Sequence, residues 1–359
     1  VQGTLANPWD ITVFIYLVLS MVAFDGFYTL VSVPYIAMFA ELYEKPKERA
    51  QVQLFRQIFA AFGLILAFMM PMLISNLMTS MSVFEAYKYV GLAIGALGSI
   101  PYIISAVTNR ERKEFSMDPN LSLRRTFGVT LRNKSFLMFA LASLMINFSF
   151  LWMQGLMEFF ATNFLGIQKA DVTILLMTMF ITALPFLPIW GRAYRKYGTR
   201  KCFIVSNVIF VLALQPFLIV SGLMNAIPLT VVAGIGLSGY MMLPELMVSE
   251  IIDEDEVKTK VRREGVYFGM NAFVSRLAYS MEGVTYALLF SITGYQGNTP
   301  PTPEIDIVFR AAFTLIPLLA FGLAVIGLKF YGLHGKRLEQ VRTEMEKLHV
   351  EKVKRLKGI

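Results

Sequence analysis

Long apolar stretches dominate this sequence and constrain its fold more than any other feature. Nine of them are close to or above the roughly 20 residues that a helix needs to cross a hydrocarbon core of about 30 Å. They lie at Ile11–Ala40, Leu54–Ile74, Tyr87–Thr108, Ser135–Ala161, Val172–Trp190, Cys202–Leu223, Ile227–Ile252, Gly265–Ile292 and Ile305–Phe330. Because the bilayer interior offers no water to backbone N–H and C=O groups, such stretches must form helices. The sequence therefore predicts an all-α polytopic membrane protein with nine transmembrane helices.

Composition excludes several classes of site. Hydrophobic residues make up 56% of the 359 residues, which is too many for one or two soluble domains. The single cysteine is Cys202, and the two histidines, His334 and His349, lie near the C-terminus. We therefore expect neither a disulfide framework nor a metal site built on His and Cys.

The net charge of +8 is better explained by topology than by nucleic-acid binding. Basic residues gather in the segments after the first, third, fifth, seventh and ninth stretches, and this side holds 28 of the 33 Lys and Arg. By the positive-inside rule this side is cytoplasmic, so we expect a multi-pass protein of the cell membrane with a cytoplasmic C-terminus. Nine spans then place the N-terminus outside, although the sequence from Val1 onward shows no pattern of a cleavable signal. An odd number of helices missing ahead of Val1 would explain this.

The predicted domains follow from one long charged loop. Residues 109–134 combine many charges with the turn-forming Asp118-Pro119-Asn120 and divide the helices into two bundles. We expect an incomplete three-helix bundle at residues 1–108 and a six-helix bundle at residues 135–332. The tail at residues 333–359 is an amphipathic helix that either lies near anionic headgroups or is simply solvated.

A run of charges separates the seventh and eighth stretches. The segment from Ser249 to Arg276 reads SEIIDEDEVKTKVRREGVYFGMNAFVSR, and we expect a loop at the membrane surface. Its charges either keep a turn soluble or form ion pairs with the other bundle that close the cytoplasmic side. We favour the second alternative and predict a cytoplasmic gate. The predicted gate residues are Glu250, Asp253, Arg262 and Arg263.

Asp25 and Arg276 are two of the ionisable residues that lie inside predicted spans, where a charge costs several kcal/mol unless it faces water or a partner. Asp25 stands in MVAFDGFYTL, and it either contacts a solute or holds neighbouring helices together by hydrogen bonds. Arg276 lies eleven residues past Gly265, which is about 16 Å along a helix. It requires an anion, a carboxylate partner or water, and Glu282, six residues on, lies on a different face of the same helix.

Several segments resemble one family in the same order. The segment EIIDEDEVKTKVRREGVYFGMNAF is similar to the loop between the tenth and eleventh helices of the glycoside-pentoside-hexuronide cation symporters, the melibiose-permease-like branch of the major facilitator superfamily. The segments VPYIAMFAELYEKPKERAQVQLFRQIFAAFG, GRAYRKYGTRK and FYGLHGKRLEQV resemble the fourth to fifth helices, the loop after the eighth helix and the exit from the twelfth. The resemblance implies that the nine spans are helices four to twelve of twelve.

The resemblance also implies roles for particular residues. Ser32 stands where the family has a sugar-binding Asp, Arg56 matches an Arg of the fifth helix that contributes to sugar binding, and Arg276 takes the place of a Lys near the cavity. Trp152 and Asn147 could supply an aromatic platform and hydrogen-bonding groups for a sugar. Alternatively, Trp152 is an interfacial anchor and Asn147 bonds neighbouring helices.

These observations predict a secondary active transporter rather than an enzyme. We expect symport of a small polar solute, a sugar or glycoside, with H⁺ or Na⁺ by alternating access, and no cofactor. The expected partners are the solute and the lipid bilayer, not nucleic acid or a second copy. The alternatives are a lysolipid or amphiphile carrier and a truncated membrane protein without transport activity.

Overall fold

The computed structural model describes residues 11–109, 128, 130–295, 297 and 300–357, and the long elements in this part of the chain are all helices. In chain order they are α1 (Ile11–Leu42), α2 (Pro46–Leu77), α3 (Val83–Thr108), α6 (Lys134–Phe164), α7 (Lys169–Tyr197), α8 (Thr199–Leu214), the short 3-10 helix η1 (Gln215–Leu218), α9 (Leu223–Thr259), α10 (Glu264–Thr293), α11 (Pro303–Phe330) and α12 (Lys336–Lys357). The predicted all-α membrane architecture is confirmed.

Eight of the nine predicted apolar stretches each fall on one of these helices, and the stretch Cys202–Leu223 runs from α8 through η1 to the first residue of α9. The count of spans also differs. Among the described residues, eight helices are both long enough and apolar enough to cross a membrane. Helix α10 has 30 residues yet is not among them. It carries Arg276 and Glu282 between its polar ends, and it packs against α6 and α1. These polar groups lower the mean hydropathy of α10 without shortening it, which explains why α10 is not counted among the apolar spans.

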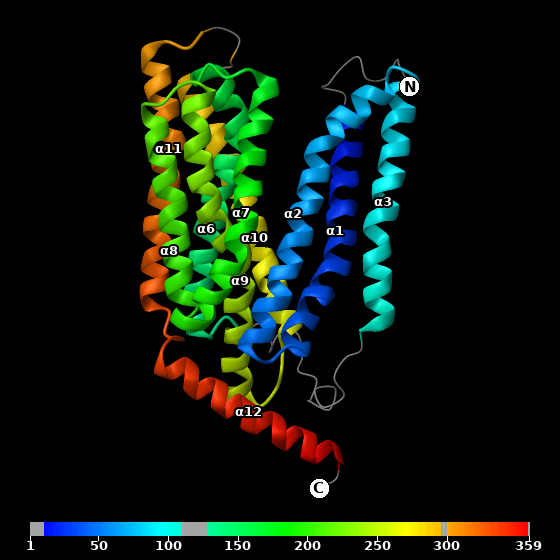
Figure 1. Ribbon diagram of the computed structural model, residues 1–359, viewed down its shortest axis with the longest axis vertical. Coiled ribbons are helices and arrows are strands. Elements are labelled where there is room, and N and C mark those ends of the chain that lie inside the picture. Colours follow the sequence, from blue (N-terminus) through cyan, green and yellow to red (C-terminus); the bar gives the residue numbers. More distant parts are fainter. Residues whose placement is uncertain (1–10, 110–127, 129, 296, 298–299, 358–359) are drawn as a thin grey trace.

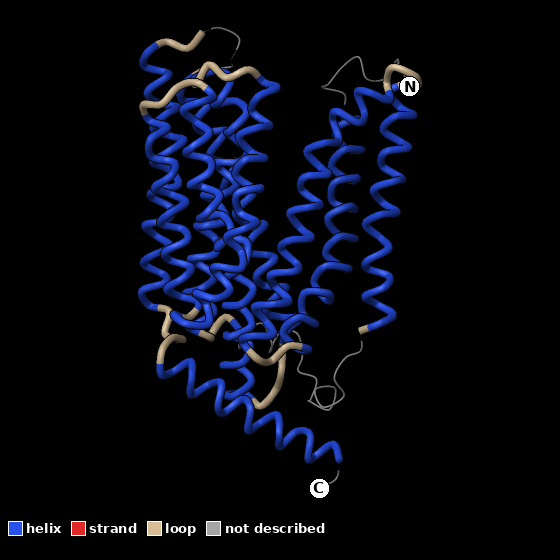
Figure 2. The backbone as a smooth tube through the Cα atoms, viewed as in Figure 1, coloured by secondary structure: helices blue, strands red, loops and turns tan. Residues whose placement is uncertain are grey.

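The helices form two groups that lie side by side (Figure 1). Helices α1 to α3 form one group and α6 to α11 the other, with α1 packed against α10 and α2 packed against α7 and α9. The tube view shows that loops lie at the two ends of the groups and that α12 crosses one of these ends (Figure 2). Most of the predicted inter-bundle loop at residues 109–134 lies outside the described residues.

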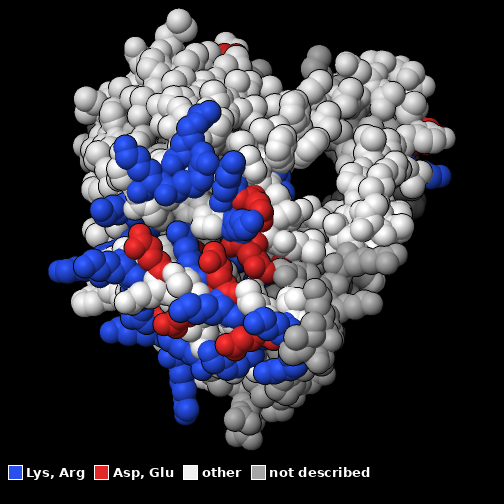
Figure 3. Space-filling model, turned by 60° about the horizontal axis from the view of Figure 1, so that its bottom comes forward, with Lys and Arg blue, Asp and Glu red and all other residues white. Residues whose placement is uncertain are grey.

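We call the end where α12 lies the basic end. Exposed cations gather there around the turn between α7 and α8, and acidic residues lie among the cations nearer to α12 (Figure 3). The exposed cations of that turn are Arg192, Arg195, Lys196 and Lys201. The other end of the larger group is fixed by Arg310 of α11, which donates hydrogen bonds to the carbonyl oxygens of Phe164 (2.6 Å) and Val220 (2.7 Å).

The predicted loop from Ser249 to Arg276 is mostly helical, which corrects that prediction. Helix α9 continues to Thr259 and α10 begins at Glu264, so the turn spans only residues 260–263. Lys260 ends α9 in the left-handed conformation (φ 62°). The helix persists through the charged run because its carboxylates are buried against partners from α2, from the turn after α9 and from α12.

Candidate functional site

The last turns of α9 bury a dense set of carboxylates at the basic end. None of these residues is more than 3% exposed; the set is Glu250, Asp253, Glu254, Asp255 and Glu256. Isolated carboxylates buried in this way would cost several kcal/mol each, so their stability depends on paired cations. This burial disagrees with the less favoured alternative, in which the charges only keep a turn soluble.

Arg49 of α2 pairs with Asp253 of α9 and so joins the two groups of helices. Arg49 Nη1 lies 2.5 Å from Asp253 Oδ2 and Nη2 lies 2.9 Å from Oδ1, while Nε donates to the Tyr43 carbonyl oxygen at 2.7 Å. The two charged side chains are 2% and 3% exposed. A two-point guanidinium–carboxylate pair fixes orientation as well as charge.

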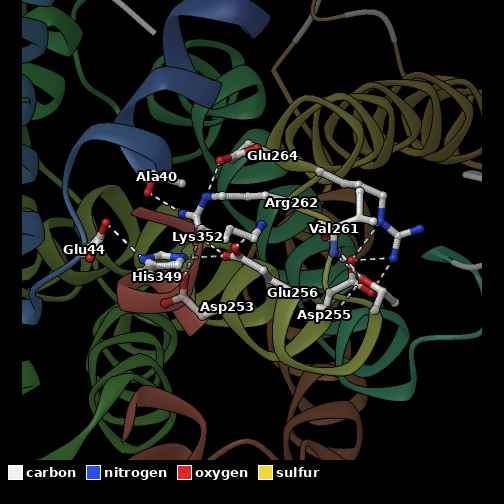
Figure 4. Close-up of polar contacts among 12 residues, drawn as sticks. Ala40, Glu44, Asp253, Asp255, Glu256, Val261, Arg262, Glu264, His349 and Lys352 are labelled. Atoms are coloured by element: carbon white, nitrogen blue, oxygen red, sulfur yellow. Dashed lines mark hydrogen bonds and ion pairs between the residues drawn. The ribbon is translucent and has the colours of Figure 1, made fainter. Parts of the chain in front are cut away.

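Arg262, in the turn after α9, is the hub of the same cluster (Figure 4). It contacts Asp253 (3.4 Å) and forms short ion pairs with Glu256 and Glu264, and Nη2 donates to the Ala40 carbonyl oxygen of α1 at 2.6 Å. Burial would lower the pKa of Arg262, but Glu264, Glu256 and Asp253 outweigh it and raise the pKa above its ordinary value. Arg262 is therefore a permanent cation between the two groups.

Arg263 has a more local role than Arg262. It pairs with Asp255, through Nη2 to Oδ1 at 2.6 Å and Nε to Oδ2 at 3.0 Å, and both residues belong to α9 and the turn that follows it. This pair fixes the turn itself. Of the four predicted gate residues, two contact the other group of helices: Asp253 pairs with Arg49, and Arg262 donates to the Ala40 carbonyl oxygen.

Helix α12 covers the cluster and contributes cations to it. His349 lies with Nε2 3.0 Å from Glu256 Oε2 and with Nδ1 3.0 Å from Glu44 Oε1, in the segment between α1 and α2 (Figure 4). Lys352 pairs with Glu256 at 2.9 Å, and Arg342 pairs with Glu250 at 2.9 Å. A single helix of the C-terminal tail thus contacts both groups.

The apolar face of α12 is turned toward the protein. The four side chains of this face are at most 8% exposed; they are Leu338, Val341, Met345 and Leu348. The tail was expected either to place this face near lipid headgroups or to be solvated. The structure gives it a different partner, because the acidic end of α9 lies beneath it.

A second pair between the groups lies further from the basic end. Arg56 of α2 forms a short ion pair with Glu245 of α9 and also donates to Gln53 Oε1 at 2.9 Å. The guanidinium carbon lies 5.5 Å from the ring centroid of Tyr35 and 5.3 Å from that of Phe39, so two aromatic faces of α1 contact it. Arg56, predicted as a solute-binding residue, is held by both groups.

The deepest pair joins Asp25 of α1 to Arg276 of α10. Arg276 Nε lies 2.9 Å from Asp25 Oδ2, Nη2 lies 2.8 Å from Oδ1, and Nη2 also donates to Thr29 Oγ1 at 2.5 Å. The arginine side chain is 36% exposed and the aspartate 57%. Of the three alternatives for Arg276, an anion, a carboxylate partner or water, the structure supplies a carboxylate, and it lies on the other group of helices.

The remaining predicted binding residues lie in different surroundings. Ser32 is buried on α1, two turns after Asp25. Asn147 of α6 accepts a hydrogen bond from Tyr240 Oη at 2.8 Å and donates to the Ser143 carbonyl oxygen. Trp152 is fully buried and its indole N–H donates to the Ala312 carbonyl oxygen at 3.0 Å, so in this conformation its ring packs between helices.

Residue-by-residue reasoning missed three members of this interface. Glu245 is a carboxylate inside the apolar run MMLPELMV, so the signal that singled out Asp25 was present there too. Arg49 stands in a short basic segment, where it looks like a topology signal. His349 belongs to the tail, and nothing local indicates that it reaches Glu44 and Glu256.

The geometry is that of two helix groups joined by charged pairs across their interface, and the family comparison agrees with it. Residues 4–335 match the family described as MFS/sugar transport protein. The chain belongs to this family, the glycoside-pentoside-hexuronide branch of the major facilitator superfamily. Its members are membrane transporters of small molecules and not enzymes, as the sequence predicts.

Individual relatives have low sequence identity and different named substrates. The chain is 21% identical to the glucuronide carrier protein homolog of Escherichia coli, over 92% of this chain and 73% of the relative. It is 21% identical to the isoprimeverose transporter of Lactiplantibacillus pentosus, over 91% and 69%. It is 24% identical to the sodium-dependent lysophosphatidylcholine symporter 1 of Gallus gallus, over 70% of this chain and 48% of the relative.

Proposed function

We propose that this chain is a secondary active symporter that moves a sugar or glycoside together with H⁺ or Na⁺ by alternating access. The observation that carries the proposal is the Asp25–Arg276 pair, a half-exposed ion pair that bridges the two helix groups about 18 Å along α10 from its first residue. An ionisable pair at this depth is expensive unless it faces a wet path. A solute that competes for either charge would loosen the contact between the groups.

The buried cluster at the basic end supports a gate, which alternating access requires in addition to a binding site. Arg49–Asp253, Arg262–Ala40 and His349–Glu44 all tie α1 and α2 to the larger group at that end. We propose that these contacts close the basic end in this conformation and that they break when the path opens there. By the positive-inside rule this end, with the C-terminus, is cytoplasmic.

Arg276 favours a particular kind of glycoside. A guanidinium binds a carboxylate at two points, as it does here with Asp25, so a sugar acid can replace Asp25 without leaving the arginine unpaired. Ser32, Arg56 and Asn147 would supply hydrogen bonds to hydroxyl groups of the same solute. Among the relatives, the glucuronide carrier homolog has a name that fits this chemistry.

Uptake into proteoliposomes tests this function. The purified chain would be given a radiolabelled glucuronide or a neutral disaccharide, with an imposed H⁺ or Na⁺ gradient. We expect gradient-driven glucuronide uptake that Arg276→Gln abolishes, and normal uptake by Glu158→Gln, whose carboxylate pairs with the exposed Lys169. No uptake of either sugar by the unaltered chain would refute the proposal.

A second candidate function is transport of a lysolipid, and one observation favours it. Apolar side chains beside Asp25 are strongly exposed, with Phe24 at 74% and Phe27 at 71%. A zwitterionic headgroup could place its phosphate on Arg276 and its quaternary ammonium on Asp25 while its acyl chain follows this surface. Uptake of lysophosphatidylcholine without uptake of sugars in the same assay would establish this function in place of the first.

A further inference from the structure

Glu282 is a carboxylate deep in α10 that the interface described above does not use. It lies 18 residues after Glu264, about 27 Å along the helix, and is half-buried. Within the described part of the chain it forms no ion pair, whereas Asp25, Glu245 and Glu158 pair with Arg276, Arg56 and Lys169. A carboxylate at this depth without a cation is costly while it is ionised.

The surroundings of Glu282 form a built site against α6. Gly155 of α6 faces it, and a Cβ at that position would overlap both Glu282 Oε1 and Tyr286 Oη. The Tyr286 ring packs on the Trp152 indole with 4.8 Å between centroids. Gly155 therefore makes room for the carboxyl and phenol groups, and Trp152 fixes the position of the phenol.

The hydrogen bonds of Tyr286 bear on whether Glu282 carries a proton. Tyr286 Oη lies 2.9 Å from Glu282 Oε1 and 3.1 Å from the Trp152 carbonyl oxygen. A carbonyl oxygen and an ionised carboxylate can only accept, and one phenol can donate only one proton. With Glu282 ionised, one of these two contacts would contain no hydrogen. With Glu282 protonated, the carboxyl donates to Tyr286 Oη and Tyr286 donates to Trp152, so both contacts are hydrogen bonds.

Resting on the proposed function, we infer that Glu282 is a proton-binding site and that the coupling ion is H⁺. The carboxylate takes one proton from water on one side and returns it to water on the other, and no other bond changes. When the proton leaves, the Tyr286 hydroxyl turns from Trp152 to Glu282 and donates to the carboxylate. Among the described residues, Tyr279 and Tyr286 interact electrostatically with Glu282, and Tyr279 also interacts with Tyr28, Asp25 and Arg276.

Infrared difference spectroscopy tests the proton site without any solute. The purified chain in liposomes would be compared between acidic and alkaline buffer in the region where protonated carboxyl groups absorb. We expect a carboxyl C=O band that is absent in Glu282→Gln and shifted in Tyr286→Phe, which removes the hydroxyl that accepts its hydrogen bond. Glu158→Gln serves as the matched control and should keep the band. A band of undiminished intensity in Glu282→Gln would overturn the inference.

Transport coupling gives a second test that separates this inference from the proposed function. A gradient of about one pH unit can drive roughly tenfold accumulation for one proton per solute. We expect the unaltered chain to accumulate the glucuronide to this extent and Glu282→Gln to lose the dependence on the gradient. Proton-driven accumulation by Glu282→Gln, or accumulation by the unaltered chain that requires Na⁺, would reject the proton site while symport stands. Absence of all uptake would reject the symporter, and the infrared band would then decide the proton site alone.

Discussion

Arg276 of α10 holds Asp25 of α1 at two points, with Nε 2.9 Å from Oδ2 and Nη2 2.8 Å from Oδ1. Each residue alone would be a costly charge in an apolar helix, and together they supply each other's partner across the interface of the two helix groups. The pair is half-exposed, which distinguishes it from the buried Arg49–Asp253 pair. The half-exposed Asp25–Arg276 pair is suited to exchange partners, and the buried Arg49–Asp253 pair is suited to hold the two groups together.

The Asp25–Arg276 pair should show strong energetic coupling. Asp25→Asn and Arg276→Gln each leave one charge unpaired, so each should lower the free energy of unfolding, and the double variant should recover most of the loss. Because the residues are in direct contact, the cycle should show a coupling between the two losses, so that they do not simply add. Unfolding in detergent micelles measures it, with Arg192→Gln, an exposed arginine, expected within about 0.5 kcal/mol of the unaltered chain. Simply additive losses would contradict the pairing.

The contrast between single residues and pairs explains what could be predicted from this sequence. Asp25 and Arg276 are each visible as charges in apolar runs, but 251 positions separate them and no local pattern indicates their contact. The helical end of α9 could not be predicted because its carboxylates depend on Lys352, 96 residues away from Glu256, and on Arg49, 204 residues away from Asp253. Local periodicity predicts the helices, while the charge pairs depend on tertiary contacts.

The buried Arg49–Asp253 pair should be much more sensitive to loss of one partner than of both. Asp253→Asn leaves the Arg49 guanidinium buried with its charge uncompensated, and we expect a loss of about 3–5 kcal/mol. Replacing both, with Arg49→Met and Asp253→Leu, should restore most of that stability because the uncompensated charge is gone. Thermal unfolding monitored by tryptophan fluorescence tests both variants. A double variant as unstable as the single one would show that the pair itself stabilises the fold.

Loss of the charges around Arg262 should open the basic end. Ala40 is fully buried and its carbonyl oxygen accepts from Arg262, so Ala40→Cys reports on this contact in a Cys202→Ser background. We expect the combination Asp253→Asn with Arg262→Gln to speed maleimide labelling of this cysteine about tenfold, because an opening free energy lowered by about 1.4 kcal/mol changes the population by that factor. Ala161→Cys, buried in α6, should stay unlabelled. An unaltered rate at position 40 would reject the gate.

His349 should help to hold the two groups of helices together at the basic end. His349→Ala removes the contacts at 3.0 Å to Glu44 and to Glu256, so it should speed labelling of Ala40→Cys in the same direction as the gate variant. His334 is the matched control: burial and the neighbouring Arg200 and Lys201 lower its pKa, so at pH 7 its removal deletes no charge. His334→Ala should leave the labelling rate unchanged. Equal rates for the two variants would show that α12 has no influence on the basic end.

Close approach of α8 and α9 should make Gly236 irreplaceable. A Cβ at this position would lie 2.5 Å from the backbone nitrogen of Phe210 and 2.6 Å from the carbonyl oxygen of Ser206, and backbone atoms of a neighbouring helix cannot turn aside as a side chain can. Gly236→Val must therefore separate the two helices, at a cost of about 1–3 kcal/mol or more. Gly322 of α11 has nothing within 4 Å of its Cβ position, so Gly322→Val gives the same change of residue without the overlap. Unfolding midpoints should fall for Gly236→Val alone, and an equal fall in both variants would mean that the valine acts through helix propensity and not through packing.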